Sequence, residues 1–339
     1  MSVLNNAPLM ENIKWATLAC VVAAAVSYVL TPIVRKLAIK KGVVDDPKQD
    51  DRRVHKEPTP RWGGLAIYAG IVLSGIVTFL FAHRPVGAYI WGIFIISSVL
   101  MVVGALDDLY QYKAKIQAAV LLLAGVAVQF FDDGAKNARV HIYGFDVPFS
   151  AGYIHLAWLG IPLTAIYIFV VTKTMDTIDG IDGLTAGIAT IAAATLSLIA
   201  VYEGQGRVAI LTAATCGAAL GFLRHNYNPA KIFMGTGGAY VLGFTLACLS
   251  VVGTLKTAAA AAIFMPLLIF GLPIVDAVVV VIKRIRSGVP ITQADKRHFH
   301  HGLLARGLSQ RQTVAVLYTA AAILCVIGLL AIRIFGNHK

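Results

Sequence analysis

Charged residues are scarce in this sequence. Asp, Glu, Lys and Arg make up 14% of its 339 residues, whereas 58% of the residues are hydrophobic, and the mean hydropathy is +0.76. This composition excludes a soluble globular domain and is typical of multi-pass membrane proteins. Apolar stretches and their connections fill almost the whole length, so we expect one integral-membrane domain over residues 1–339 without an appended soluble domain.

Cysteine and acidic residues are also few. The four cysteines lie in apolar stretches without paired spacing, which excludes a disulfide framework or a cysteine zinc site and indicates packing residues. The 17 acids against 29 Lys and Arg residues give a net charge of +12. In a soluble protein this excess would indicate nucleic acid. Here we expect no nucleic-acid partner, because the cations set membrane topology and meet anionic lipid head groups. Some of them can also hold a phosphorylated substrate at the membrane surface.

Ten apolar stretches have roughly the length needed to cross a bilayer. They cover residues 14–33, 64–82, 88–105, 116–131, 154–172, 184–201, 207–223, 237–253, 258–282 and 313–335. Successive crossings alternate in direction, so five polar loops share one face: 34–63, 106–115, 172–183, 224–236 and 283–312. These loops hold 21 of the 29 Lys and Arg residues, which places this face in the cytoplasm and both termini outside.

We therefore predict an all-α polytopic membrane protein, a single bundle of about ten transmembrane helices with cytosolic active-site loops. The outside connection at 132–153 is longer than the others. In it, segments 139–143 and 147–149 flank Gly144-Phe145-Asp146, which predicts a small β-hairpin on the outer side.

The first two cytosolic loops carry cations and a pair of acids. Arg53, His55 and Lys56 precede a Pro-x-Pro turn and two glycines, which would hold these cations beside a phosphate. Asp107 and Asp108 follow the third apolar stretch. Adjacent carboxylates at that place cost free energy unless they are ion-paired or bound to a metal. Lys113 and Lys115 are the predicted neutralising partners.

The third loop places Asp176, Asp179 and Asp182 at three-residue intervals, among glycines that allow close approach of a ligand. Three acids with only Lys173 beside them suit a hard cation such as Mg²⁺, or ribose hydroxyls. An EF-hand is excluded because its acid spacing and its late Glu are absent. One of these acids could serve as a helix cap, but hardly all three.

The last two cytosolic loops combine polar, aromatic and cationic residues. The fourth contains Asn226, Lys231 and Phe233 before a glycine-rich stretch that opens a helix, which by itself is a weak phosphate-binding signal. In and before the fifth loop lie Asp276, Arg284, Arg297, His298, His300 and His301. Zinc binding is disfavoured, because no cysteine is near and the His-x-His-His spacing is unusual for zinc. Anion binding or proton handling is favoured.

These motifs resemble those of the polyprenyl-phosphate N-acetylhexosamine-1-phosphate transferases (glycosyltransferase family 4), which include the phospho-N-acetylmuramoyl-pentapeptide transferases. The resemblance runs from about residue 45 to 312. The final motif is similar to that of the branch that transfers N-acetylglucosamine-1-phosphate. The motifs that carry the resemblance are the Pro60–Gly64 turn, Asp107-Asp108, Lys113 with Gln117, Asp179-Gly180-x-Asp182-Gly183-Leu184, Pro229–Gly235, and Asp295-x-x-His298-x-His300-His301.

The resemblance implies that a polyprenyl (undecaprenyl) phosphate attacks the diphosphate of a UDP-N-acetylhexosamine, with Mg²⁺ or Mn²⁺, in the bacterial inner (cytoplasmic) membrane. UMP would leave, and the lipid product would start a cell-envelope glycan. A homodimer is left open. The implied roles are Asp107 and Asp108 for orienting or deprotonating the lipid phosphate and helping with the metal; Asp179 and Asp182 for nucleotide or metal; Phe233 for stacking on uracil; and Lys113, His298, His300, His301 and nearby arginines for holding the diphosphate.

The sequence departs from the family pattern at the predicted site. Thr236 stands where the resemblance implies an Asp that binds Mg²⁺, and Lys173 and Asp176 stand where two Asn residues are usual. Either Asp176 supplies the missing metal ligand, or the chain is a divergent paralogue with weakened or altered activity. Two other interpretations are a transporter and a non-catalytic binding regulator. Transport sites lie near the bilayer midplane, whereas these acids crowd one membrane face.

Overall fold

The computed structural model describes residues 7–47, 57–134, 139–146, 153–253, 267–290 and 297–336. Arg53, His55 and Lys56 lie outside these ranges. Within them, eight helical segments are long and apolar enough to cross a membrane, which agrees with an all-α multi-pass membrane protein. They belong to the helices α1 (Ala7–Lys40), α2 (Gly64–Phe81), α3 (Ala88–Tyr110), α5 (Gly160–Thr177), α6 (Leu184–Tyr202), α7 (Gly206–Asn226), α8 (Gly235–Gly253) and α12 (Gln310–Gly336).

Two of the ten predicted spans differ from expectation. The fourth corresponds to α4 (Ala114–Ala127) and a 3₁₀ turn at Val128–Phe130, which together form a shorter apolar helix. The ninth is described only from residue 267 onward, where α10 (Gly271–Arg286) ends in Lys283, Arg284 and Arg286. The short helix α11 (Phe299–Ala305) follows. The number of crossings therefore remains a prediction.

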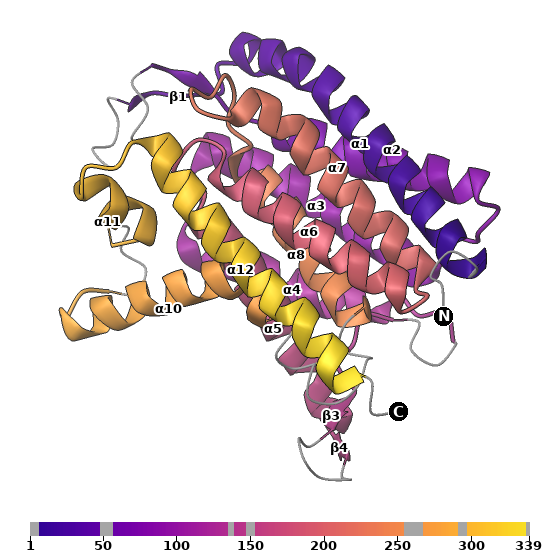
Figure 1. Ribbon diagram of the computed structural model, residues 1–339. Helices are drawn as coiled ribbons and strands as arrows, with labels where there is room; N and C mark the ends of the chain where they lie inside the picture. The colour runs from indigo at the N-terminus through magenta and orange to yellow at the C-terminus, as the bar shows by residue number, and fades with distance from the viewer. Residues whose placement is uncertain are drawn as a thin grey trace.

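Helix α8 forms the centre of the bundle, and it packs against α2, α3, α5, α6 and α7 (Figure 1). Its close packing depends on glycine. A Cβ on Gly104 of α3 would clash with the backbone of Gly237, and one on Gly64 of α2 would clash with that of Gly238. The glycine-rich stretch that suggested phosphate binding is thus explained by helix packing, as is common where membrane helices approach closely.

Two short antiparallel strand pairs accompany the helices. Strand β1 (Val44–Asp45) pairs with β2 (Thr59–Pro60) in the first polar loop, a ribbon that the sequence did not predict. On the opposite end, β3 (Gly144–Asp146) pairs with β4 (Tyr153–His155). The predicted hairpin thus exists, but its position was wrong, because Gly144-Phe145-Asp146 is a strand and not the turn.

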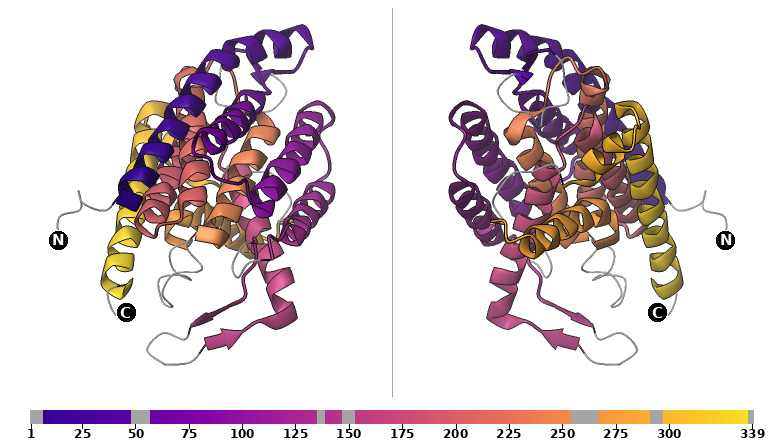
Figure 2. Two further views of the ribbon diagram at one scale, coloured as in Figure 1. Left: turned by 90° about the vertical axis from the view of Figure 1, so that its right-hand side faces the viewer. Right: turned by 90° about the vertical axis from the view of Figure 1, so that its left-hand side faces the viewer.

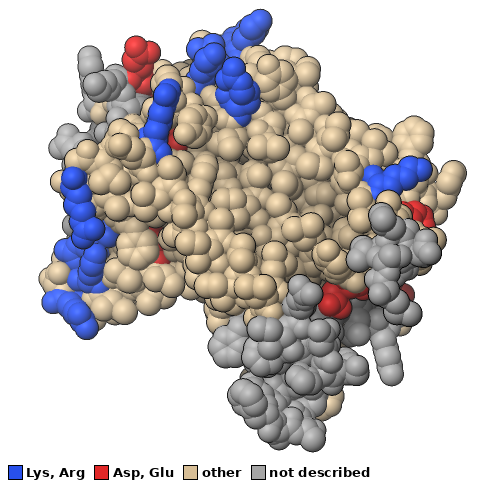
Figure 3. All heavy atoms as spheres, in the orientation of Figure 1, with Lys and Arg blue, Asp and Glu red and all other residues tan. Residues whose placement is uncertain are grey.

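The molecule has two unlike ends. In Figure 3 most of the visible Lys and Arg atoms gather over the end of α1 and along α10 and α11. The last turns of α1 carry Lys36 and Lys40, with Lys41 directly after the helix, and the last turn of α10 carries Lys283, Arg284 and Arg286. The start of α1 and the end of α12 lie toward the other end, from which β3 and β4 project (Figures 1 and 2).

Candidate active site

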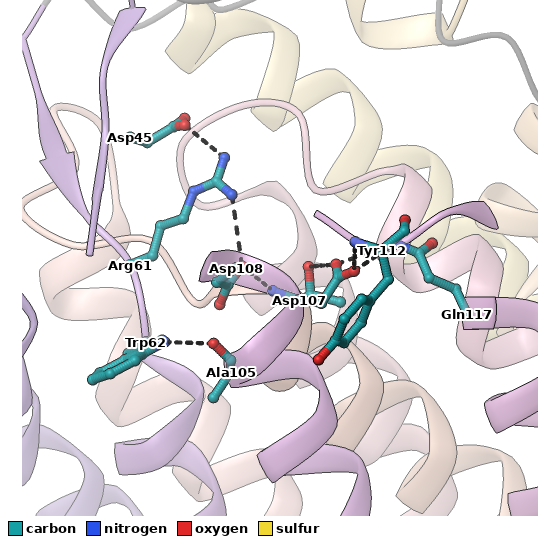
Figure 4. Close-up of polar contacts among 9 residues, drawn as sticks. Asp45, Arg61, Trp62, Ala105, Asp107, Asp108, Tyr112 and Gln117 are labelled. Atoms are coloured by element: carbon teal, nitrogen blue, oxygen red, sulfur yellow. Dashed lines mark hydrogen bonds and ion pairs between the residues drawn. The ribbon is translucent and has the colours of Figure 1, made fainter. Parts of the chain in front are cut away.

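The adjacent acids at the end of α3 lie at the centre of the candidate site, and Asp107 is fully hydrogen-bonded (Figure 4). Its Oδ1 accepts the backbone N–H of Tyr112 at 2.9 Å and the amide of Gln117 at 3.0 Å. Its Oδ2 accepts the same amide at 3.1 Å and the hydroxyl of Thr236 at 3.0 Å. Both oxygens of this carboxylate are therefore engaged by donors from α4 and α8.

Asp108 has a different environment, with a side chain that is 1% exposed. Its Oδ1 accepts the backbone N–H of Thr236 at 3.1 Å and lies 3.6 Å from Nη1 of Arg61. Arg61 also bonds Asp45 at 2.6 Å. The Oδ2 of Asp108 is buried against Gly235 without a hydrogen-bond donor among the described residues. A buried carboxylate oxygen in this state carries a desolvation cost that a cation would relieve.

The neutralising partners differ from those predicted. Lys113 and Lys115 are both exposed at the start of α4. Arg61 of the first loop and Gln117 of α4 make the contacts with the acid pair instead. Arg61 was missed because a pairing between residues so far apart in sequence depends on how the helices pack.

The third loop adds acids beside this pair. Lys173 donates to Asp176 at 2.7 Å and to the amide oxygen of Gln117 at 2.7 Å. Burial raises the pKa of Asp179 to about 7; the nearby Thr185 hydroxyl opposes the shift, and the carboxylates of Asp176 and Asp108 reinforce it. An excess of negative charge therefore gathers between the first, second and third loops.

Asp182 and Asn226 join the third loop to the fourth. The Oδ2 of Asp182 accepts the amide of Asn228 at 2.9 Å and the N–H of Ala230 at 3.0 Å. Asn226 is buried; it accepts the N–H of Gly183 at 3.1 Å and donates to the carbonyl of Ile232 at 3.0 Å. These bonds give both residues a clear positioning role.

Phe233 and Lys231 lie in the segment that these bonds fix. The N–H of Phe233 donates to the carbonyl of Pro60 at 2.8 Å, and its carbonyl accepts the N–H of Gly63 at 2.9 Å. The first loop thereby borders the fourth. Lys231 is exposed beside it.

The histidine motif is anchored by an acid in α10. Asp276 is 2% exposed. It accepts the Nδ1–H of His298 at 2.6 Å and the N–H of Phe299 at 2.7 Å, which fixes the start of α11. An acid inside an apolar stretch is a signal of function or pairing. Asp276 therefore stood out in the sequence, but its pairing with His298 and Phe299 was not predicted.

His300 brings the fifth loop against the third. Its ring stacks on that of His298 at a centroid distance of 5.7 Å, and the tilted ring of His301 lies 4.3 Å away. Its Nε2 is buried beside Gly180, without a partner among the described residues. Burial, together with the two neighbouring histidines, lowers the pKa of His300 to about 3, so this ring is neutral at pH 7. Farther out, Arg297 donates to the Lys283 carbonyl at 2.9 Å, next to Arg284 in the last turn of α10.

The geometry suits a cation that is bound together with a substrate. In the part of the chain that the structure describes, no three His, Cys, Asp or Glu residues form a ready-made metal site. Mg²⁺ is nonetheless often held by one or two carboxylates, with water and substrate phosphates completing its shell. The unpartnered oxygen of Asp108 and the nearby Asp179 carboxylate fit that arrangement.

Comparison with known proteins identifies the family of this chain. The profile of glycosyl transferase family 4 matches residues 90–254. A probable undecaprenyl-phosphate N-acetylglucosaminyl 1-phosphate transferase of Bacillus subtilis is 37% identical over 310 residues, covering 91% of this chain and 83% of the relative. The chain belongs to glycosyl transferase family 4.

Other relatives are similar over nearly the same length. An undecaprenyl-phosphate α-N-acetylglucosaminyl 1-phosphate transferase of Escherichia coli K12 is 29% identical, covering 88% of this chain and 78% of the relative. A decaprenyl-phosphate N-acetylglucosaminephosphotransferase of Mycobacterium tuberculosis is 31% identical, covering 87% and 77%. The family 4 match runs from α3 to the end of α8, so it includes the acid pair and the third loop but ends before the histidine motif.

Proposed function

We propose that this protein transfers a HexNAc-1-phosphate, most simply GlcNAc-1-phosphate, from a UDP-sugar to a polyprenyl phosphate, releasing UMP. The observation that carries this proposal is the convergence of the polar loops at one end of a membrane bundle. A lipid phosphate can reach that end from the bilayer and a nucleotide can reach it from water. The names of the relatives, which specify prenyl phosphates and N-acetylglucosamine, support the same reaction.

The acids would hold the cation and place the lipid phosphate. Sequence predicted metal ligands at Asp107, Asp108, Asp176, Asp179 and Asp182. We assign the metal to Asp108, whose Oδ2 has no donor among the described residues, and to the nearby Asp179. Asp107, Asp176 and Asp182 are instead assigned to the protein contacts described above. Mg²⁺ or Mn²⁺ would neutralise charge on the diphosphate. Asp107 then orients the attacking phosphate. A phosphate monoester carries about −1.5 to −2 at neutral pH, so a strong base is not needed.

The cationic, imidazole and aromatic side chains would bind the nucleotide. His298, held by Asp276, and the adjacent His300 and His301 border the acid loop from the fifth loop, where they can hold the diphosphate. Phe233 would stack on uracil. The remaining predicted contacts are Arg53, His55, Lys56, Lys113, Asn226, Lys231, Arg284 and Arg297. Positioning and charge neutralisation of this kind account for most of the catalysis in phosphoryl transfer.

The proposed placement follows from charge. The end of the bundle with the acid pair also carries the cations of α1 and α10, so it would face the cytoplasm, with both termini outside. The membrane would be the bacterial inner membrane, and the whole chain would form one integral-membrane domain. The product would begin a cell-envelope glycan.

A divergent paralogue is the second candidate, and Thr236 is the observation that favours it. Its hydroxyl contacts Asp107, so this position faces the acid pair but supplies no carboxylate. Such a protein would have weak turnover or another sugar donor.

One assay tests the proposal. Purified full-length protein is incubated with UDP-GlcNAc, polyprenyl phosphate and Mg²⁺, and UMP and the lipid product are identified by mass spectrometry. Parallel reactions omit the lipid or replace the donor with other UDP-N-acetylhexosamines. Lipid-dependent UMP release supports the proposal. Protein with a sharp unfolding transition that releases no UMP with any of these donors would overturn it.

A further inference from the structure

Lys173 has no part in the reaction as proposed above, yet it lies among the acids of the site. It belongs to the last turns of α5. Its Nζ is 2.7 Å from the amide oxygen of Gln117 on α4 and 2.7 Å from Oδ2 of Asp176. The side chain is 28% exposed, so most of it is removed from water. These contacts connect the third loop to the acid pair.

The chemistry of these contacts determines which way the Gln117 amide points. An ammonium group only donates hydrogen bonds, so the oxygen of the Gln117 amide must face Lys173. The NH₂ group of the same amide then faces Asp107, and it reaches both carboxylate oxygens, at 3.0 Å and 3.1 Å. A carboxylate at one end and an ammonium at the other hold the amide in a single orientation.

The contact with Lys173 neutralises the charge of Asp176. Asp176 lies close enough to influence the pKa of Asp179, but its Oδ2 is engaged by Lys173. Charge-assisted bonds at this distance are strong and specific. While the pair is intact, Asp176 contributes little net negative charge to the cluster formed by Asp108 and Asp179.

We propose that Lys173 is a positioning residue with two effects. Through Gln117 it holds Asp107 in place, and by pairing with Asp176 it limits the negative charge available to a divalent cation. The effect on turnover rests on the proposed function, whereas the effect on cation binding does not. Asp176 is then assigned to the ion pair with Lys173, and not to the metal.

The first experiment measures cation binding without turnover. Mn²⁺ is titrated into the full-length protein in detergent, and free Mn²⁺ is followed by electron paramagnetic resonance. We expect Lys173→Met to bind Mn²⁺ at least about threefold more tightly, because Asp176 is released to the acid cluster. Lys173→Arg retains the cation and should bind as the wild type does. Lys115→Met, at an exposed lysine of α4, is the matched control.

A double variant shows whether Asp176 causes the change. Lys173→Met combined with Asp176→Asn should return the Mn²⁺ affinity to the wild-type value. If Lys173→Met binds Mn²⁺ no more tightly than the wild type, or if the double variant stays as tight as the single one, the proposed limit on negative charge is overturned. Lys173→Gln repeats the test should the Met variant fail to show a sharp unfolding transition.

The second experiment measures turnover. Loss of a partner that orients a site residue commonly costs about 10- to 100-fold in activity, so we expect kcat of Lys173→Met to fall in this range while KM for UDP-GlcNAc changes little. Lys173→Arg should recover part of kcat, which a merely space-filling role would not explain. An unchanged kcat would overturn the positioning role. A wild-type protein without turnover would count against the proposed function, and the Mn²⁺ titration would still decide the second effect.

Discussion

At the residue scale, Asp107 and Asp108 have the same chemistry and adjacent places in the chain, but their surroundings separate their roles. Both oxygens of Asp107 accept hydrogen bonds, so its charge stabilises the fold. Asp108 keeps one buried oxygen without a donor among the described residues. Its charge is only partly compensated, by Arg61 at 3.6 Å and by the N–H of Thr236, so it is available to a bound cation.

This difference predicts opposite effects of two Asn substitutions. Asp107→Asn turns an amide NH₂ toward other donors, and we expect a loss of about 1–3 kcal/mol in unfolding free energy. Asp108→Asn removes a buried charge that Arg61 offsets only from 3.6 Å and whose Oδ2 has no donor among the described residues. Its melting temperature should therefore equal or exceed that of the wild type while UMP release is lost. Thermal unfolding and UMP release of both variants check this. A fully active Asp108→Asn protein would contradict the assignment.

His300 predicts a dependence of stability on pH. The pKa of this residue is lowered from 6.5 to about 3 in the folded protein, so the unfolded chain binds a proton here more readily. The contribution to stability is complete above pH 6.5 and is lost as the pH falls, by up to ~1.4 kcal/mol per pH unit. The melting temperature of the wild type should therefore fall more steeply below pH 6.5 than that of His300→Gln. Parallel curves would rule out this residue as the cause.

At the scale of elements, contacts between glycines hold the acid pair over the start of α8. A Cβ on Gly104 would meet the backbone of Gly237 and of Thr236. Because Thr236 donates to both acids, the packing of α3 on α8 also sets the geometry of the site.

Gly104→Ala tests this link between packing and geometry. Overpacking of this kind costs about 1–3 kcal/mol, and we expect both the melting temperature and UMP release to fall. The control is Gly302→Ala, since a Cβ on this glycine of α11 meets no atom within 4 Å. That variant should be neutral or slightly more stable, because Ala is the better helix former. Equal behaviour of the two variants would argue against a packing role for Gly104.

Asp276 is the corresponding link between α10 and α11. Asp276→Ala leaves the N–H of Phe299 and the Nδ1 of His298 without their buried partner, which costs about 1–3 kcal/mol. We expect lower stability and at least a tenfold loss of kcat. Asp276→Glu can restore the charge and should recover part of both. Steady-state kinetics and thermal unfolding measure these effects, and wild-type kcat in the Ala variant would show that the histidines do not depend on this acid.

At the scale of the whole molecule, hydropathy predicted the all-α multi-pass fold, whereas the number and direction of the crossings remain predictions and the side-chain partners could be identified only from the structure. Long apolar stretches are expected to cross the bilayer as helices, and counting these crossings predicts that the five polar loops lie on one side. The hydrogen bond from Lys173 to Gln117 depends on how α4 and α5 pack, and the ion pair of Arg61 with Asp108 depends on how the first loop lies against α3. Strand β3 was misplaced because three residues with glycine first look like a turn, and only its partner, Tyr153–His155, shows otherwise.

Topology gives a prediction at this scale. In a cysteine-free variant, a cysteine at Glu203, in the exposed turn between α6 and α7, should react with a membrane-impermeant maleimide in intact cells. A cysteine at Lys115 should react only after permeabilisation, because the positive-inside rule assigns it to the cytoplasm. Gel-shift labelling distinguishes the two sides. The reverse pattern would place the candidate site on the outer face.

The hydrogen bond between Asp276 and His298 affects where two homologous chains can be joined in a chimera. Since α10 begins at Gly271 and the acid is its sixth residue, a chimera joined before that helix would inherit the anchor and the imidazoles from the same parent. A junction placed between residues 277 and 297 would combine them from different parents. Chimeras of homologues should therefore take residues 271–305 from a single parent.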